Sequence, residues 1–317
     1  MDKSSIRIVF MGTPEFASTC LKALCDDGYN VVLVVCQPDK PVGRKHIITP
    51  PPSKVTAGEY GIEVFQPVSM KTQESYDRIK ACDPELIVTA AYGKILPQSV
   101  LDIPTYGPLN VHGSLLPVYR GAAPVQYSIL NGDKVTGVTI MKMDAGMDTG
   151  DILAKVEVPI DENIHTDALM ALLAEEGSKL LLSMIPDQIE GRIKPVKQDE
   201  ERAVMSPPIR SEQGEFTWDM DALVIHNKIR ALSSWPGAYV LSGGKKLKIY
   251  DSRYLTDEEI DGASEAVPGT VLVAHKSDLV VKCGNGCLKI LELQTEGGKR
   301  LRAADCAHNY RTGIPIG

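Results

Sequence analysis

Apolar residues in the first half of the chain fall into short continuous runs separated by longer amphipathic stretches. The runs at 31–36 and 86–91 are typical of strands buried on both faces of a sheet. The stretch between Pro14 and Gly28 instead carries apolar residues at helical spacing. This alternation predicts an α/β fold with a doubly wound, mostly parallel sheet. Its predicted strands are residues 6–10, 31–36, 63–65, 86–91, 135–143 and 151–160, and its predicted helices are 14–28, 69–81 and 168–185.

The pattern changes after residue 190. Residues 191–208 are polar and proline-containing, with little apolar periodicity, which is typical of a linker. One predicted helix, 219–232, precedes five short β-like runs separated by turn residues, which predict a small closed barrel of the OB type. We therefore expect an α/β domain over 1–189, a linker over 190–208 and a β-barrel domain over 209–317. The five runs are 238–241, 246–250, 269–274, 279–283 and 287–293.

Composition narrows the class of protein. The chain has 317 residues, of which 43% are hydrophobic and 24% charged, as in soluble two-domain proteins. Its 34 basic and 41 acidic residues argue against indiscriminate nucleic-acid binding. No apolar run reaches the ~18 residues of a membrane-spanning helix, and the N-terminus lacks the features of a signal peptide. We therefore expect a cytoplasmic protein without a membrane partner.

The seven cysteines are scattered, which fits reduced thiols. Cys283 and Cys287 form the one close pair, but no second Cys/His pair stands at zinc-site spacing. The glycines between them favour a hairpin turn over a metal site. No metal is expected. The common nucleotide-binding and hydrolase motifs are also absent, so the function has to be inferred from the site itself.

Candidate catalytic side chains are most concentrated in two segments, residues 110–124 and 143–151. Asn110 and His112 are two positions apart at the end of a predicted strand, so both side chains point to one side. An aspartate from the glycine-rich loop 143–151 would favour the protonated imidazole. An imidazolium beside an amide suits stabilisation of the oxyanion in acyl transfer. From the residues alone, a turn-capping Asn110, a core His112 and aspartates in turns stay equally open.

The string Asn-Val-His-Gly-Ser-Leu-Leu-Pro at 110–117, followed by Tyr-Arg-Gly-Ala-Ala-Pro at 119–124, closely resembles the formyltransferase family that uses 10-formyltetrahydrofolate. The resemblance extends over nearly the whole chain. Within that family, the loop at 37–44 and the C-terminal domain resemble the members that act on methionyl initiator tRNA. Further matching segments are 10–16, 37–44, 91–97, 143–153 and 234–239.

The resemblance implies a Rossmann-like formyltransferase domain with Asn110, His112 and Asp148 as its catalytic residues. The reaction it implies moves the formyl group of 10-formyltetrahydrofolate to the α-amino group of methionyl initiator tRNA, without a metal. A monomer is expected. Alternatives are a purine-precursor or amino-sugar formyltransferase, a folate-dependent hydrolase and a non-catalytic RNA-binding protein. The implied folate-binding residues are Ser114, Leu115, Leu116 and Pro117, together with the backbone of Ala90, Ala91, Tyr92 and Gly93.

Two basic segments are candidates for tRNA binding. Residues 37–54 are long for an α/β connection and rich in proline, and the resemblance implies that they enter the acceptor arm, with Arg44 in contact. Outside the acidic stretch 257–265, residues 210–317 hold 14 basic and 9 acidic residues, so the net charge conceals a local basic surface. For both segments a solvated surface is the alternative. The predicted tRNA-binding residues are Lys40, Arg44, Lys45, Arg300 and Arg302, with Lys54, Lys299 and Arg311 nearby in sequence.

Two further residues have open roles. Trp235 could stack on a base, but a tryptophan before Pro-Gly at a strand start is more typical of a packing anchor. Arg120 is either a brace for the backbone of the catalytic loop or a substrate contact.

Overall fold

The computed structural model describes residues 2–43 and 46–316. The chain forms two compact units, and each is described by itself. Unit 1 comprises Met1–Pro124, Val135–Pro159 and Met170–Pro207. Unit 2 comprises Val125–Lys134, Ile160–Leu169 and Pro208–Gly317. Residues 190–207, which the sequence predicted to be a linker, are therefore packed within unit 1, and two short segments from the first half belong to unit 2.

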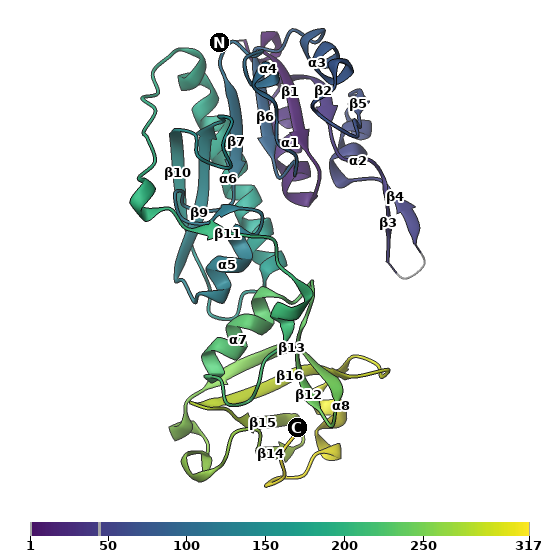
Figure 1. Ribbon diagram of the computed structural model, residues 1–317, viewed down its shortest axis with the longest axis vertical. Helices are drawn as coiled ribbons and strands as arrows, with labels where there is room; N and C mark the ends of the chain where they lie inside the picture. The colour runs from purple at the N-terminus through teal and green to yellow at the C-terminus, as the bar shows by residue number, and fades with distance from the viewer. Residues whose placement is uncertain (1, 44–45, 317) are drawn as a thin grey trace. The chain divides into compact units, whose positions relative to one another are not determined.

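A seven-stranded sheet forms the centre of unit 1 (Figure 1), in the order β10-β9-β7-β6-β1-β2-β5. The first five strands in sequence order are mutually parallel, and β9 and β10 are antiparallel to their neighbours. The prediction of a doubly wound, mostly parallel sheet is confirmed. The strands are β1 (Arg7–Gly12), β2 (Asn30–Val35), β5 (Val64–Phe65), β6 (Leu86–Ala90), β7 (Pro108–His112), β9 (Val135–Lys142) and β10 (Ile152–Pro159).

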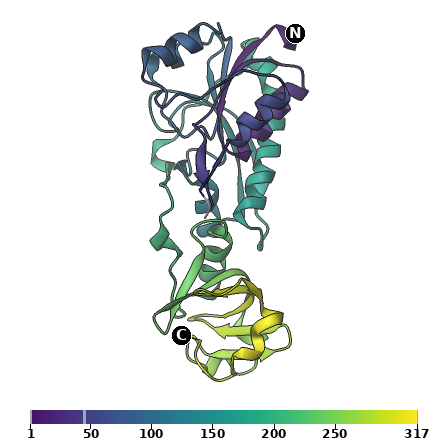
Figure 2. The ribbon, with the colours of Figure 1, turned by 90° about the vertical axis from the view of Figure 1, so that its right-hand side faces the viewer.

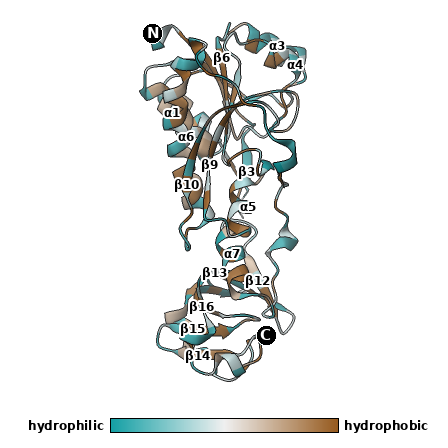
Figure 3. Ribbon diagram, turned by 90° about the vertical axis from the view of Figure 1, so that its left-hand side faces the viewer, coloured by the Kyte–Doolittle hydropathy of each residue, from teal (hydrophilic) through white to brown (hydrophobic). Residues whose placement is uncertain are grey.

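All five residues of β6 are buried, as the continuous apolar run predicted, and Figure 3 shows the hydrophobic colouring of this strand. α3 begins at Gln73 rather than at residue 69, because the Thr72 side chain accepts a hydrogen bond from the Ser75 amide and caps the helix. α2, α4 and α5 were not predicted; each has eight residues or fewer and begins at or just after a proline. The helices along this half are α1 (Glu15–Asp26), α2 (Pro52–Glu59), α3 (Gln73–Lys80), α4 (Gln98–Leu101), α5 (Pro124–Leu130) and α6 (Thr166–Ile189).

The long connection after β2 contains a β-hairpin that the sequence did not predict. β3 (Lys40–Val42) pairs antiparallel with β4 (Ile47–Thr49). The hairpin projects beside α2 in Figure 1. Both of its apolar positions on β4 are exposed: Ile47 and Ile48 each expose 62% of their surface.

Unit 2 contains an antiparallel sheet in the order β12-β13-β16-β15-β14, with β17 paired to β16 (Figure 2). The predicted β-domain is confirmed, and each predicted run overlaps one strand, although the runs 269–274 and 279–283 extend beyond β14 and β15. The predicted closure of the barrel is not made by backbone pairing, since β12 and β14 do not pair with each other within the described residues. The strands are β12 (Ala238–Ser242), β13 (Lys245–Leu255), β14 (Val271–His275), β15 (Asp278–Lys282), β16 (Cys287–Thr295) and β17 (Leu301–Arg302).

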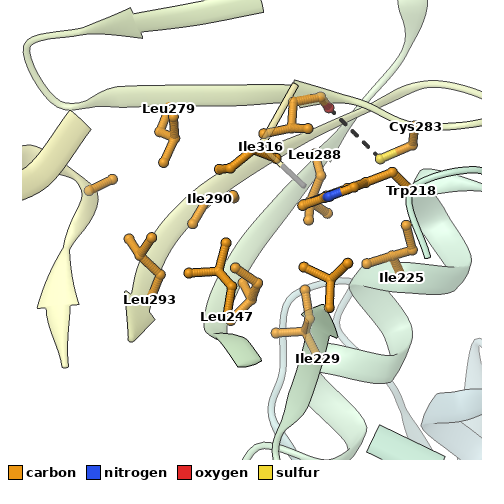
Figure 4. Packing of buried hydrophobic residues seen from close by; sticks show 14 of the residues in the cluster. Trp218, Ile225, Ile229, Leu247, Leu279, Cys283, Leu288, Ile290, Leu293 and Ile316 are labelled. Carbon is orange, nitrogen blue, oxygen red and sulfur yellow. Dashed lines mark hydrogen bonds between the residues drawn. The ribbon is translucent and has the colours of Figure 1, made fainter. Parts of the chain in front are cut away.

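α7 (Ala222–Ala231) packs against this sheet. Ile225 and Ile229 of α7 lie in one core cluster with Leu288 and Ile290 of β16 (Figure 4). Trp218 is the buried tryptophan of the cluster, whereas Trp235 is 57% exposed. The expectation that Trp235 anchors the packing was therefore wrong.

Cys283 and Cys287 flank the turn between β15 and β16, where the Cys283 amide donates to the Gly286 carbonyl at 3.0 Å. The predicted hairpin is confirmed. Both thiols are buried, and burial raises the pKa of Cys287 to about 11.

Candidate active site

Asn110 lies beside Thr89 in the parallel ladder of β6 and β7. The Thr89 hydroxyl donates to the Asn110 side-chain carbonyl oxygen at 2.8 Å, and Thr89 is 2% exposed. A carboxamide has one oxygen and one NH2 group. Because Thr89 occupies the oxygen, the Asn110 NH2 group is oriented to donate elsewhere.

His112 lies between two acceptors. Its Nε2 is 3.0 Å from the Tyr119 carbonyl oxygen, and its Nδ1 is 3.6 Å from Asp148 Oδ2. A carbonyl only accepts, so Nε2 carries a proton, and Nδ1 faces a carboxylate. An acceptor therefore lies at each ring nitrogen of His112. The structure thus brings the predicted pair of His112 and Asp148 together.

Asp148 occupies a strained position in the loop between β9 and β10. Its φ is +54°, in the left-handed region that residues other than glycine rarely adopt. Its Oδ2 accepts the Gly121 amide at 2.8 Å, which directs the carboxylate toward β8 (Arg120–Gly121) and His112. Asp144, the other candidate in this loop, instead accepts from the Gly146 amide and the Thr149 hydroxyl. Asp144 is therefore a turn residue and Asp148 is the partner of the imidazole.

The segment predicted to be a linker also holds the site together. Gln198 donates from Nε2 to the carbonyl oxygens of Asp148 and Gly150 at 2.8 and 2.7 Å. β11 (Met205–Ser206) pairs with β8, and the Ser206 hydroxyl donates to the Tyr119 carbonyl at 3.1 Å. Periodicity gave no signal for these contacts.

The Arg120 side chain links β8 to the side chains of Gln198 and Glu200. It is 4% exposed, and its Nε donates to Gln198 Oε1 at 3.0 Å. Its two terminal nitrogens each donate to Glu200 at 2.8 Å. The hydrogen bonds from Arg120 hold the pKa of the Glu200 carboxyl below its usual range. With all three nitrogens engaged, Arg120 is a structural brace rather than a free substrate contact.

The implied folate-binding residues are unequally accessible. Ala91 and Gly93 are exposed in the turn that follows β6, with φ of +45° and +76°, while Ala90 and Tyr92 are buried. This turn leaves the sheet next to the end of β7, since Ala90 pairs with Val111.

The second implied segment is mostly enclosed. Ser114 and Leu116 have no exposed surface, and Pro117 is buried. The Ser114 carbonyl accepts from the Thr139 hydroxyl, which itself accepts from the Leu116 amide. Leu115 is the partly exposed member of the set. Leu115 is therefore the residue of this segment whose side chain a co-substrate can contact directly. Ser114, Leu116 and Pro117 are buried and stabilise the conformation of the segment.

The structure describes three of the five predicted tRNA-binding residues. Arg44 and Lys45 lie outside the described residues. Lys40 is exposed on β3 and donates to Gln37 at 2.6 Å. The nearby Lys54 forms an ion pair with Asp39 at 2.8 Å.

In unit 2, Arg300 forms an ion pair with Glu292 and lies 4.1 Å from the centre of the Tyr250 ring. Arg302 on β17 is exposed. Each unit thus presents exposed basic side chains, and Arg300 of unit 2 lies beside an aromatic ring.

Among residues 2–43 and 46–316, no cluster of three metal-ligating side chains is present. Within the same residues, no helix has the length and hydrophobicity needed to cross a bilayer.

Two family models match the chain. The model described as formyl transferase matches residues 6–185, and the model described as formyl transferase, C-terminal domain, matches residues 208–311. Together they cover both units.

Relatives of known name match over almost the full length. A methionyl-tRNA formyltransferase from Bacillus velezensis is 47% identical over 314 residues, 98% of this chain and 98% of that protein. One from Caldicellulosiruptor saccharolyticus is 45% identical over 306 residues, 96% of this chain and 97% of that protein. The crystal structure of HypX from Aquifex aeolicus in complex with tetrahydrofolic acid matches in fold, with a TM-score of 0.65 at 19% identity. That match covers 95% of this chain and 46% of the HypX chain.

The comparisons confirm the formyltransferase resemblance and the assignment to the transferases. The named relatives are 47% and 45% identical to this chain over both units, which shows a closer relationship than a shared formyltransferase fold. The chain belongs to the methionyl-tRNA formyltransferase family.

Proposed function

We propose that this protein transfers the formyl group of 10-formyltetrahydrofolate to the α-amino group of methionyl initiator tRNA. The observation that carries the proposal is the arrangement of Asn110, His112 and Asp148 at the ends of β7 and the 143–151 loop. The protein is proposed to act as a monomer in the cytoplasm.

The co-substrate would supply an activated formyl carbon. When the amine attacks that carbon, negative charge develops on the formyl oxygen. The NH2 group of Asn110, oriented by Thr89, would donate to this oxygen. The His112 imidazole would stabilise this charge from beside it, and Asp148 would keep the ring correctly turned. Removal of one oxyanion donor typically costs ~10²–10³ in rate.

The amine must also lose a proton as its bond to the formyl carbon forms. Asp148 is the carboxylate nearest to the imidazole, and its side chain is 17% exposed. It is therefore partly accessible to a water molecule that would carry this proton away. The bond from the formyl carbon to N10 of the folate would then break, and tetrahydrofolate would leave with a proton on N10.

The residues at the ends of β6 and β7 fit a folate co-substrate. The exposed backbone at Ala91 and Gly93 and the partly exposed Leu115 would contact it. The family models and the tetrahydrofolic acid held by the HypX neighbour support a folate derivative as the donor.

We propose tRNA contacts by Lys40, Arg44 and Lys45 from unit 1 and by Arg300 and Arg302 from unit 2. Exposed cations attract phosphates without reading sequence. The hairpin of β3 and β4 gives Lys40 a regular scaffold instead of a loose loop. Arg302 is exposed, and Arg300 also lies over an aromatic ring.

The test is an assay with purified protein, 10-formyltetrahydrofolate and charged initiator or elongator methionyl-tRNA. We expect formylmethionyl-tRNA from the initiator species. Formylation of an amino sugar or a purine precursor alone would contradict the proposal, as would folate hydrolysis without transfer. Binding of tRNA without any turnover would instead identify a non-catalytic RNA-binding protein.

A further inference from the structure

Gln198 holds the loop that carries Asp148. Its side chain makes three hydrogen bonds within unit 1, two to the carbonyl oxygens of Asp148 and Gly150 and one from Arg120. The orientation of its amide is unambiguous. The NH2 group faces two acceptors, while Oε1 faces a guanidinium that only donates.

The two hydrogen bonds from Gln198 reach the part of the loop with an unfavourable backbone conformation. Asp148 has φ of +54°, a conformation that costs of the order of 1 kcal/mol or more for a residue other than glycine. Gly150 also permits close packing, since a Cβ there would lie 1.7 Å from the Lys142 carbonyl oxygen. Two hydrogen bonds from one side chain therefore fix the backbone on both sides of Thr149.

Gln198 is itself held in place. Arg120 lies between Gln198 and Glu200, with Nε on the first and both terminal nitrogens on the second. Arg120 is almost fully buried, so its guanidinium is enclosed where it meets Gln198. This chain of contacts begins in residues 198–200 and ends at the aspartate that faces His112.

We infer that Gln198 is a positioning residue for catalysis: it holds the strained loop so that the Asp148 carboxylate faces the His112 imidazole. This inference rests on the proposed function for its kinetic part. Gln198 is proposed to act through Asp148, whose carbonyl it binds.

The kinetic test compares Gln198→Glu and Gln198→Leu with a matched control, Gln188→Leu. Gln198→Glu keeps an acceptor for Arg120 and removes both donors to the loop. Gln188 also donates from Nε2 to a backbone carbonyl, that of Tyr106 at 2.7 Å, in the same unit. We expect both Gln198 variants to lower kcat up to ~10²-fold through misplacement of Asp148. KM for tRNA and folate should stay within about twofold, and the control should keep wild-type kcat.

A double-mutant cycle distinguishes positioning from general destabilisation. In an Asp148→Asn background, Gln198→Glu should lower kcat little further, because both changes affect the same interaction. Equal losses of kcat in both backgrounds would overturn the inference, as would an unchanged kcat in the single variant.

A spectroscopic measurement does not depend on the proposed activity. The ¹⁵N chemical shifts of the His112 ring, identified by their loss in His112→Asn, report on its protonation and hydrogen bonds. They should change in Gln198→Glu and stay unchanged in Gln188→Leu. If wild-type protein fails to formylate tRNA, the proposed function fails, and these shifts still decide the inference. Unchanged His112 shifts in Gln198→Glu overturn it.

Discussion

The hydroxyl oxygen of Thr89 lies 2.8 Å from the side-chain carbonyl oxygen of Asn110. The two residues are register partners on adjacent parallel strands, so the contact is built into the pairing of β6 with β7. Within residues 2–43 and 46–316, it leaves the NH2 group of Asn110 as the free half of the amide. The hydroxyl on β6 thereby sets the direction in which the oxyanion donor on β7 points.

Replacement of Thr89 by Val should therefore lower kcat by about twofold to tenfold, because one hydrogen bond contributes roughly 0.5–1.5 kcal/mol. Steady-state kinetics with charged initiator tRNA measures the effect. KM should be little changed, since no substrate contact is removed. Thr89→Ser keeps the hydroxyl and serves as the control. A loss in Thr89→Ser as large as that in Thr89→Val would contradict the role of the hydroxyl.

His112→Ala should reduce kcat by ~10²–10³ or more, since it removes the imidazole beside the developing oxyanion. Binding of tRNA, measured by filter binding or fluorescence, should survive, because the basic residues assigned to tRNA are elsewhere. Turnover equal to that of the wild type would refute the assigned role.

Arg302→Ala should weaken tRNA binding and reduce the slope of log K against log salt by about one, as expected for one lost phosphate contact. Arg300→Ala should have a smaller effect on the salt slope, because Arg300 is already paired with Glu292. Binding titrations over a salt series measure both slopes. An unchanged slope in Arg302→Ala would remove this residue from the proposed surface.

The second unit should lose stability below neutral pH because of His226. Burial is the main cause that lowers the pKa of this imidazole from its ordinary value near 6.5. Its ring nitrogens contact the Ser252 hydroxyl and the Glu162 carbonyl at 2.9 and 3.0 Å. The folded state takes up the proton less readily than the unfolded state. The contribution is therefore present above pH ~6.5 and is lost as the pH falls below it.

Denaturant unfolding at pH 7.5 and pH 5.5 tests this prediction. The free energy of unfolding of the wild type should fall more between the two values than that of His226→Gln, which cannot take up a proton. Arg230 and Arg253 act in the same direction as burial, and Asp251 opposes it. The same pH dependence in both proteins would show that His226 is not the responsible group.

Local patterns in the sequence were sufficient for the main elements of both units. The buried run at 86–91 and the helical spacing after Pro14 depend on neighbours only a few residues apart, so β6 and α1 were predicted. Asn110 and His112 were predicted as neighbours for the same reason, since residues that are two positions apart on a strand share a face. The hairpin of β3 and β4 was missed because its exposed apolar positions resemble no buried strand.

The sequence by itself determined the sheet, the string at 110–124 and the family that this string resembles. Only the tertiary structure decided which aspartate faces His112, what orients Asn110 and that Arg120 is a brace. The reason is distance along the chain: Thr89 and Asn110 are 21 residues apart, and Gln198 and Asp148 are 50 apart. Contacts of that kind depend on strand register and on the path of the chain after α6, and neither leaves a periodic signal in the sequence.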